Sequence, residues 1–252
     1  MLSKNKIKLI QSLNRKKERD ESGLFLVEGN KMVEEALRSG FNVETLVCTP
    51  QFLQEHPGVH QKVNELIETD NGSIQKASLL QNPQDSLALV FQPDYAEPPI
   101  NFRNDLLLAL DFIQDPGNLG AILRIADWFG IQKVICSENT VDVFNPKVVQ
   151  ASMGAIFRVQ VMYTGLEVFL NNVLKNQAPV YGTFLEGNDI YSEKLSKNGI
   201  VVLGNEGNGI SAEVAGLVSH KIYIPSFSSG KGSESLNVAM AAAICCSEFR
   251  RR

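Results

Sequence analysis

Three polar segments in the second half of the chain hold the residues best placed for chemistry: Asp111 to Gly130, Gly204 to Ser211, and Ile224 to Ala243. Each begins at the end of a short apolar run, as expected where strands of a parallel sheet end in ligand-facing loops. Their glycines allow the main chain to approach a ligand closely. These segments therefore indicate a small-molecule site at one edge of a sheet.

The glycine spacing of the second segment excludes the common nucleotide loops. Gly204, Gly207 and Gly209 follow the order GxxGxG, whereas a dinucleotide loop has the order GxGxxG and lies in the first strand-helix unit. Residues 229–233 (SGKGS) lack the glycine and the hydroxyl residue that a Walker loop places around its lysine. The pattern disfavours a phosphate cradle.

The first segment combines a turn with an amphipathic helix. Pro116 and Gly117 favour a turn, and we expect Asn118 to cap the helix that follows. Arg124 falls in the second turn of this helix, where an arginine commonly forms a surface salt bridge. In the third segment Ser235 and Asn237 precede a small-residue helix from Val238 to Phe249, and helix capping alone could explain both.

In order and internal spacing the three segments resemble the SpoU (TrmH-like) family of RNA 2′-O-ribose methyltransferases. The N-terminal part resembles the substrate-binding domain often attached to that family. The resemblance implies methyl transfer from S-adenosyl-L-methionine to a ribose 2′-hydroxyl, with ribosomal RNA favoured over transfer RNA. It also implies a deep trefoil knot in the C-terminal α/β domain and a small N-terminal α/β domain of L30e-like fold.

The resemblance assigns roles by motif position. The implied catalytic residues are Arg124, Asn118, Glu206, Ser235 and Asn237. Arg124 would orient and stabilise the forming alkoxide or, less readily, accept its proton, since guanidinium groups normally keep theirs. The implied methyl-donor residues are Thr183, Leu185, Gly204, Asn205, Glu206, Gly207, Ile224 and Leu236. No metal is expected.

The chain departs from the commonest family pattern near the third segment. Ser226 stands where methionine is usual, and Ala239 replaces a frequent serine. About three additional residues separate Ile224 from Leu236. These changes leave the polar set intact and alter the loop beside it.

Apolar runs in the C-terminal half predict five strands with helical stretches between them: Leu106 to Leu110, Lys133 to Cys136, Val180 to Leu185, Gly199 to Leu203, and Lys221 to Ile224. Their continuous hydrophobicity is typical of strands covered on both faces, so we expect a doubly wound α/β domain with a parallel sheet.

The first ninety-odd residues predict a separate, small α/β domain, with strands at Phe25 to Glu28, Val43 to Cys48, and Ser86 to Phe91, and a helix at Lys31 to Arg38. The proline-rich stretch from Gln92 to Asn104 suits a linker. We place the boundary near Glu97, giving a substrate-binding domain at 1–96 and a methyltransferase domain at 97–252.

Composition limits the remaining possibilities. Four cysteines without CxxC spacing and three histidines suggest neither a disulfide framework nor a zinc site. The N-terminus lacks the apolar core of a signal peptide and no run is long enough for a membrane span, so we expect a cytoplasmic protein. The net charge of −4 argues weakly against RNA, but residues 1–19 concentrate positive charge, which favours an RNA-contacting arm. Its basic residues are Lys4, Lys6, Lys8, Arg15, Lys16, Lys17 and Arg19.

Three alternatives remain at this stage. A transfer RNA could be the substrate, or the chain could be an inactive RNA-binding or assembly module of the same fold. A nicotinamide-dependent oxidoreductase rests only on doubly wound topology, and the glycine spacing opposes it. Family precedent and the stretch from Lys147 to Val159, which is mixed apolar and small, suggest a homodimer through the C-terminal domain, although ordinary core packing explains that stretch equally well.

Overall fold

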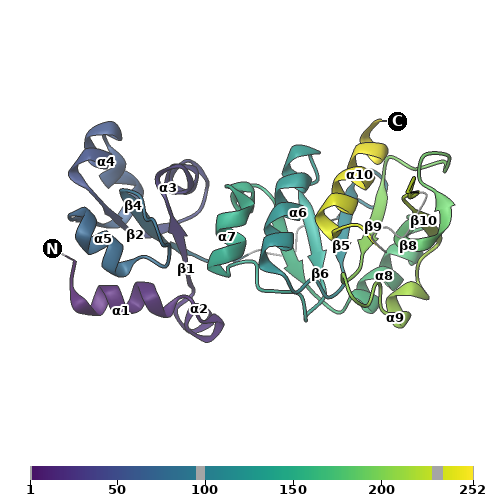
Figure 1. The fold of residues 1–252 in the computed structure, drawn as a ribbon, viewed down its shortest axis with the longest axis horizontal. Coiled ribbons are helices and arrows are strands. Elements are labelled where there is room, and N and C mark those ends of the chain that lie inside the picture. The colour runs from purple at the N-terminus through teal and green to yellow at the C-terminus, as the bar shows by residue number, and fades with distance from the viewer. Residues whose placement is uncertain (1, 95–99, 229–234, 252) are drawn as a thin grey trace. The chain divides into compact units, whose positions relative to one another are not determined.

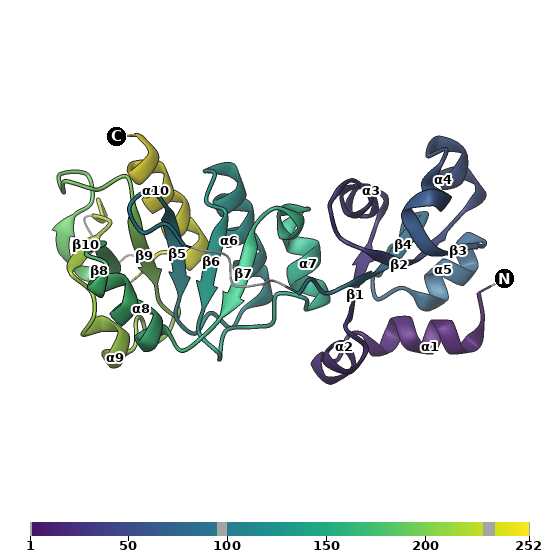
Figure 2. The same ribbon diagram turned by 180° about the vertical axis from the view of Figure 1, so that it is seen from behind.

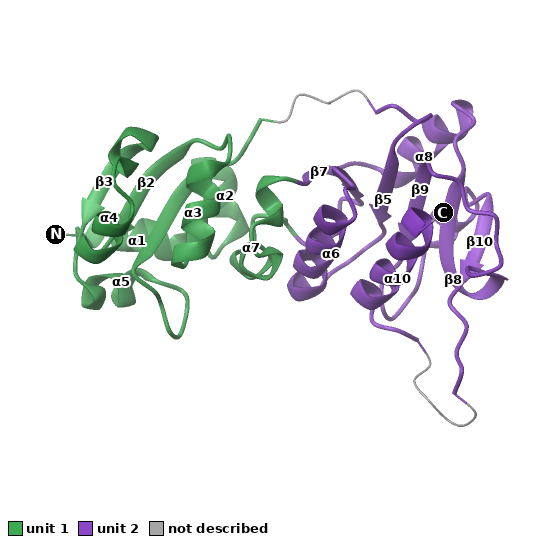
Figure 3. Ribbon diagram, turned by 90° about the horizontal axis from the view of Figure 1, so that it is seen from above, with its two compact units in different colours: residues 1–95, 142–158 green, residues 96–141, 159–252 purple. Residues whose placement is uncertain are grey.

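The structure, a computed structural model, describes residues 2–94, 100–228 and 235–251 (Figures 1 and 2). Two compact units divide the chain, one of residues 1–95 with 142–158 and one of residues 96–141 with 159–252 (Figure 3). The predicted boundary at residues 96 and 97 lies outside the described residues. The assignment of 142–158 to the first unit is a feature that the linear order of the sequence did not suggest.

The first unit contains a four-stranded sheet in the order β1-β4-β2-β3, in which β4 is antiparallel to β1 and β2, and β2 is parallel to β3. Leu24, Leu26 and Leu87 on one face of the sheet pack with Ile10 and Ile74 from helices α1 and α5. The elements are α1 (Lys4–Ser12), α2 (Lys16–Ser22), β1 (Leu24–Glu28), α3 (Asn30–Arg38), β2 (Val43–Cys48), α4 (Pro50–Glu55), η1 (Val59–Lys62), β3 (Val63–Glu68), α5 (Asn71–Ala77), β4 (Ser86–Phe91), α7 (Pro146–Ser152) and η2 (Ala155–Phe157).

The second unit contains a six-stranded parallel sheet in the order β10-β8-β9-β5-β6-β7. Helices α6 and α10 pack together on one side of it, and α8, which contacts α9, lies on the other (Figure 3). The elements are β5 (Leu106–Leu110), α6 (Pro116–Trp128), β6 (Lys133–Cys136), β7 (Gln160–Tyr163), α8 (Leu166–Lys175), β8 (Val180–Asp189), β9 (Gly199–Leu203), α9 (Ala212–Ala215), β10 (His220–Tyr223) and α10 (Val238–Arg251). The parallel sheet with helices on both faces confirms the predicted α/β architecture.

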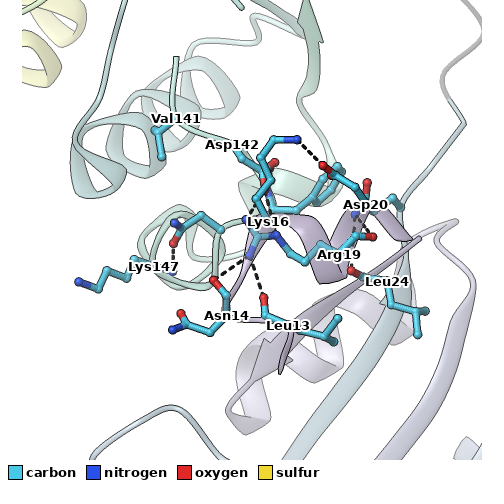
Figure 4. A network of polar contacts seen from close by, with 12 residues as sticks. Leu13, Asn14, Lys16, Arg19, Asp20, Leu24, Val141, Asp142 and Lys147 are labelled. Carbon is cyan, nitrogen blue, oxygen red and sulfur yellow. Dashed lines mark hydrogen bonds and ion pairs between the residues drawn. The ribbon is translucent and has the colours of Figure 1, made fainter. Parts of the chain in front are cut away.

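Arg19 is a structural residue rather than part of a basic RNA-contacting surface. Its side chain is 1% exposed. The Nη1 atom donates to the carbonyl oxygens of Leu13 and Asn14 at 2.8 and 3.1 Å, and Nε donates to Asp142 Oδ2 at 2.9 Å (Figure 4). The guanidinium therefore ties the N-terminal helices to the segment 142–158 within the first unit, and the prediction that Arg19 belongs to the arm was wrong.

Most other charges of the predicted basic arm are also paired. Lys16 Nζ forms an ion pair with Asp20 Oδ2 at 2.7 Å, and Lys17 Nζ lies 3.7 Å from Glu21 Oε1. Ion pairs of the same kind join Lys6 to Glu65 and Arg15 to Glu18. Within the described part of the arm, Lys4 and Lys8 are left without an ion-pair partner, so the concentrated positive potential expected at this end is largely neutralised.

The segment proposed from sequence as a dimer surface is mainly internal. Val148, Val149 and Ile156 are buried. Nearby, the ring of Phe25 in β1 lies 4.7 Å from that of Phe144. Most apolar side chains of 147–158 therefore pack inside the first unit, which is the packing explanation left open by the sequence.

Candidate functional site

The helix that carries the first motif is capped by Asp115, not by Asn118. The Oδ1 atom of Asp115 accepts a hydrogen bond of 2.8 Å from the backbone N–H of Asn118, and Pro116 occupies the first helical position, where a missing N–H costs nothing. The expected cap at Asn118 was wrong. Because Asp115 takes the capping role, the Asn118 side chain is free for other contacts.

Asn118 joins the three predicted motifs. Its Nδ2 atom donates to Glu206 Oε1, and its Oδ1 atom accepts from Asn237 Nδ2 at 2.9 Å. Asn237 at the same time caps α10, since its Oδ1 accepts from the N–H groups of Ala239 and Met240 at 3.0 and 3.3 Å. Three of the five predicted catalytic side chains thus form one hydrogen-bonded chain.

The loop after β9 is closed on itself and tied to the loop after β5. Asn205 and Gly209 exchange backbone hydrogen bonds of 3.0 and 2.9 Å. The Asn205 side chain accepts from the N–H groups of Gly207 and Asn208, and its Nδ2 donates to the carbonyl oxygen of Phe112 at 2.9 Å. The backbone of this loop, and with it Glu206, is therefore held in one conformation.

Gly204 is required by the close approach of the loop's two ends. A Cβ atom at this position would lie 2.3 Å from the carbonyl carbon of Gly209 and 2.4 Å from the nitrogen of Ile210. Any larger residue would push these backbone segments apart.

Sequence reasoning missed Asp111 and Asp115. The buried Asp111 carboxylate accepts a hydrogen bond of 2.8 Å from the Ser211 N–H, which joins the end of β5 to the start of α9. An aspartate before Pro-Gly at a helix start is a recognisable capping signal, so Asp115 could have been found. The role of Asp111 depends on a contact 100 positions away and left no local signal.

Arg124 and Ser235 are exposed, and no hydrogen bond or ion pair joins either to the Asn118 chain in the ranges that the structure covers. Arg124 lies on α6, the same helix as Asn118. Arg124 forms no salt bridge within the described ranges, in contrast to a typical surface arginine on a helix, so its guanidinium is available to a ligand.

Of the predicted methyl-donor residues, Gly204 to Gly207 follow β9, Ile224 follows β10 and Leu236 precedes α10. Thr183 and Leu185 lie within β8, between β10 and β9, because this strand continues to Asp189 and does not end at Leu185 as predicted. Thr183 Oγ1 donates to the carbonyl oxygen of Val202 at 3.2 Å. Leu185 and Leu236 are 73% and 50% exposed, and Ile224 is half-buried. The exposed side chains of Leu185 and Leu236 offer apolar surface that suits the face of an adenine ring.

A pocket of about 390 Å³ is lined in part by Asn205, Asn208 and Gly209 of the loop after β9. Among the predicted donor residues only Asn205 lines it, together with Asp111, Phe112, Asn208 and residues at the start of α8. Neither Thr183 nor Ile224 lines this pocket.

Metal and membrane features are absent from the described ranges. No group of three or more His, Cys, Asp or Glu side chains there could hold a metal ion. No described helix combines the length and apolar character needed to cross a membrane.

Two family models match successive parts of the chain. The SpoU rRNA Methylase family model matches residues 105–247, and the MRM3-like substrate binding domain matches residues 4–88. The chain is 31% identical over 246 residues to the 23S rRNA (guanosine(2553)-2'-O)-methyltransferase RlmP of Bacillus subtilis, covering 97% of this chain and 96% of that one.

Two solved structures have the same architecture over the full length. A TrmH-family protein from Porphyromonas gingivalis superposes with a TM-score of 0.89 at 42% identity, covering 100% of this chain and 99% of that one. The AdoMet-bound rRNA methyltransferase from Sinorhizobium meliloti has a TM-score of 0.87 at 31% identity, with coverage of 100% and 97%. Since the family model spans more than half of its residues and a curated relative aligns over nearly all of them, the chain belongs to the SpoU rRNA methylase family.

Proposed function

We propose that this chain transfers a methyl group from S-adenosyl-L-methionine to a ribose 2′-hydroxyl of ribosomal RNA. The observation that carries the proposal is the hydrogen-bonded chain of Glu206, Asn118 and Asn237, which brings the three motifs together at one edge of the sheet. Relatives named as ribosomal RNA 2′-O-methyltransferases support the substrate class, including the Bacillus subtilis protein.

The chemistry of each side chain suggests its role in this reaction. The ribose oxygen would take the methyl group as its bond to the donor sulfur breaks, and the hydroxyl proton would pass to water. The guanidinium of Arg124 would stabilise negative charge as it develops on that oxygen, and it would pair with a neighbouring RNA phosphate. Ser235 and the Asn118 chain would orient the ribose by hydrogen bonds, with rate gained from positioning the oxygen for attack. The 2′-hydroxyl is also the group that distinguishes RNA from DNA.

The donor would be held by Gly204 to Gly207 through the backbone, by Leu185, Ile224 and Leu236 through apolar contact, and by Thr183. When bound, S-adenosyl-L-methionine supplies an electrophilic methyl group. Gly204 supports this placement because its lack of a Cβ atom lets the loop ends approach each other. The residues beside Leu236 at 229–234, which include part of the lengthened loop, lie outside the described residues.

Four further proposals concern the protein as a whole. Its C-terminal domain would contain a deep trefoil knot, its N-terminal domain at 1–96 would be L30e-like and contact RNA, and it would act in the cytoplasm. It would also form a homodimer through the C-terminal domain. Helices α6 and α10 support the dimer, because they pack together and leave Trp128 86% and Met240 61% exposed.

The function is tested by incubating the purified chain with methyl-labelled S-adenosyl-L-methionine and ribosomal RNA from cells that lack its gene. We expect label at a defined nucleotide whose 2′-O-methyl group protects the adjacent phosphodiester from alkali. Failure to bind the donor, or label found only on bases, would rule the proposal out. Mapping 2′-O-methyl positions in RNA from cells with and without the gene identifies the nucleotide and separates ribosomal from transfer RNA.

A further inference from the structure

A polar pocket of about 350 Å³ lies at one end of the four-stranded sheet in the first unit. Asn30 follows β1, Asn71 and Gln75 belong to the helix after β3, and the remaining lining residues precede β4. Strands β1, β2 and β3 are parallel, so their carboxyl ends meet at this edge. Ligands of α/β sheets commonly bind outside such strand ends. The full lining is Asn30, Asn71, Gln75, Gln81, Asn82, Pro83, Gln84 and Asp85.

The floor of the pocket is organised by hydrogen bonds. The backbone N–H of Asn30 donates to Gln84 Oε1 at 2.7 Å, and Asn30 Nδ2 donates to Asp85 Oδ2 at 3.2 Å. Ser86 Oγ donates to Asn30 Oδ1 at 2.9 Å. Asp85, which supplies the one carboxylate of the lining, is therefore already hydrogen-bonded to the amide of Asn30.

The segment from Leu79 to Asp85 forms one wall of the pocket, and both of its ends are hydrogen-bonded to other parts of the first unit. The carboxylate of Glu28 accepts from the N–H of Leu79 at 3.2 Å at the start of the wall. At its end the N–H of Thr49 donates to the carbonyl oxygen of Asp85 at 2.9 Å. A wall held at both ends is prepared for a ligand before the ligand arrives, which lowers the entropy lost on binding.

The rim consists of four carboxamides without partners in the described chain: Asn71, Gln75, Gln81 and Asn82. All four are exposed. A carboxamide carries both donors and an acceptor, and no lysine or arginine lines the pocket. This chemistry favours a neutral ligand with alternating donors and acceptors over a phosphate, which calls for cations.

We propose that this pocket binds an unstacked nucleobase of a single-stranded stretch of the RNA substrate. Asparagine and glutamine recognise base edges through paired hydrogen bonds, best with adenine, and RNA-binding proteins favour splayed bases of single strands. The volume lies near the lower end of the range of about 300 to 1,000 Å³ for small-molecule sites. Lys31 and Lys76, each next in sequence to a lining residue, are exposed and have no ion-pair partner in the described ranges, so they are free to contact the backbone.

The pocket deepens the proposed function, since it rests on RNA being the substrate, and it is tested separately from catalysis. The full chain is titrated with fluorescent 12-nucleotide homopolymers of A, C, G and U, and with an A oligomer that contains abasic positions, at several salt concentrations. The test variants are Asn71→Ala with Gln75→Ala, and Gln81→Ala with Asn82→Ala. The matched control is Gln54→Ala with Gln61→Ala, which removes two exposed amides elsewhere in the same unit.

We expect each test variant to weaken binding of the A oligomer about tenfold, the effect of losing two ordinary hydrogen bonds, while the control binds as wild type. The slope of affinity against salt should not change, because base contacts release no counterions. The abasic oligomer should bind the variants and the wild type equally. Affinity for S-adenosyl-L-methionine should be unaltered.

Three results would overturn the pocket: unchanged affinity in both test variants, a reduced salt slope showing that phosphate was contacted instead, or no binding of any oligomer by the wild type. If the variants lose base-dependent binding while no RNA is ever methylated, the proposed function fails and the pocket stands. If RNA is methylated normally and the test variants bind the oligomers as the wild type does, the proposed function stands and the nucleobase site fails.

Discussion

The Nδ2 atom of Asn237 donates a hydrogen bond of 2.9 Å to Asn118 Oδ1, although 119 positions separate the two residues. The Nδ2 atom of Asn118 in turn donates a hydrogen bond to the carboxylate of Glu206. Because an amide can donate on one side and accept on the other, Asn118 satisfies two different partners at once. A carboxylate at this position could not do so.

Asn118→Asp should therefore harm the enzyme more than Asn118→Ala. The aspartate would place a second negative charge against Glu206, whereas alanine only removes the link. We expect about a hundredfold loss of kcat for the alanine variant, from misplacement of the reacting groups, and a larger loss with a lower melting temperature for the aspartate variant. Equal activity of the aspartate variant and the wild type would show that the link to Glu206 is irrelevant to catalysis.

Arg124→Ala should lower kcat by at least about a hundredfold, because charge on the ribose oxygen loses its stabilising guanidinium. The dissociation constant of S-adenosyl-L-methionine, measured by calorimetry, should stay near the wild-type value. Arg103→Ala is the matched control, since Arg103 is an exposed arginine of the same unit outside the motifs. Undiminished turnover in Arg124→Ala would contradict the assignment.

Gly204→Ala should abolish donor binding, since the added methyl would lie 2.3 Å from the Gly209 carbonyl carbon and must displace the loop. The control is Gly216→Ala, whose added methyl would meet its nearest neighbour at 3.5 Å in ordinary contact. Calorimetric titration with S-adenosyl-L-methionine compares the two. Wild-type affinity in Gly204→Ala would mean that this loop does not form the donor site.

Much of this site was predictable because its residues are local to strand ends. The buried strands β1, β2, β4, β5, β6 and β9 were found from continuous apolar runs. The edge strands β3 and β7 were missed, since they are partly exposed and less apolar. Contacts between distant positions, such as Arg19 with Asp142, leave no local pattern in one sequence.

The structure changes how the basic N-terminal arm must be tested. Leu2, Ile10 and Leu13 lie in the core of the first unit, so deleting residues 1–19 would damage the fold rather than only remove charge. Lys4→Ala with Lys8→Ala removes the two unpaired charges instead. If both contact phosphates, the slope of log affinity against log salt should fall by about 1.4 to 1.8.

Lys16→Ala with Lys17→Ala provides the control for this pair, because both lysines already face carboxylates. It should change the slope little. If the slope of log affinity against log salt is unaltered in the Lys4→Ala with Lys8→Ala variant, the arm has no role in RNA binding.

Glu28 makes the stability of the first unit depend on pH, and the direction of its pKa shift fixes the sign of this dependence. Burial raises the pKa of Glu28 above its ordinary value of 4.5, despite hydrogen bonds from Ser78 and the Leu79 N–H that act in the opposite direction. The folded state therefore holds the proton more tightly than the unfolded state, and the contribution of Glu28 to stability falls as pH rises through the raised pKa. Glu28→Gln, which resembles the protonated form, should remove this decline.

The comparison is made by urea unfolding at several pH values below and above 4.5, as the difference in unfolding free energy between Glu28→Gln and wild type. We expect this difference to grow in favour of the variant as pH rises. Glu65→Gln supplies the opposite sign, because the hydrogen bond from Lys6 lowers the pKa of Glu65, so that the wild type gains stability from this residue above about pH 4.5 and loses it as pH falls through the lowered pKa. A difference for Glu28→Gln that does not vary with pH would mean that this carboxyl group titrates alike in the folded and unfolded chain.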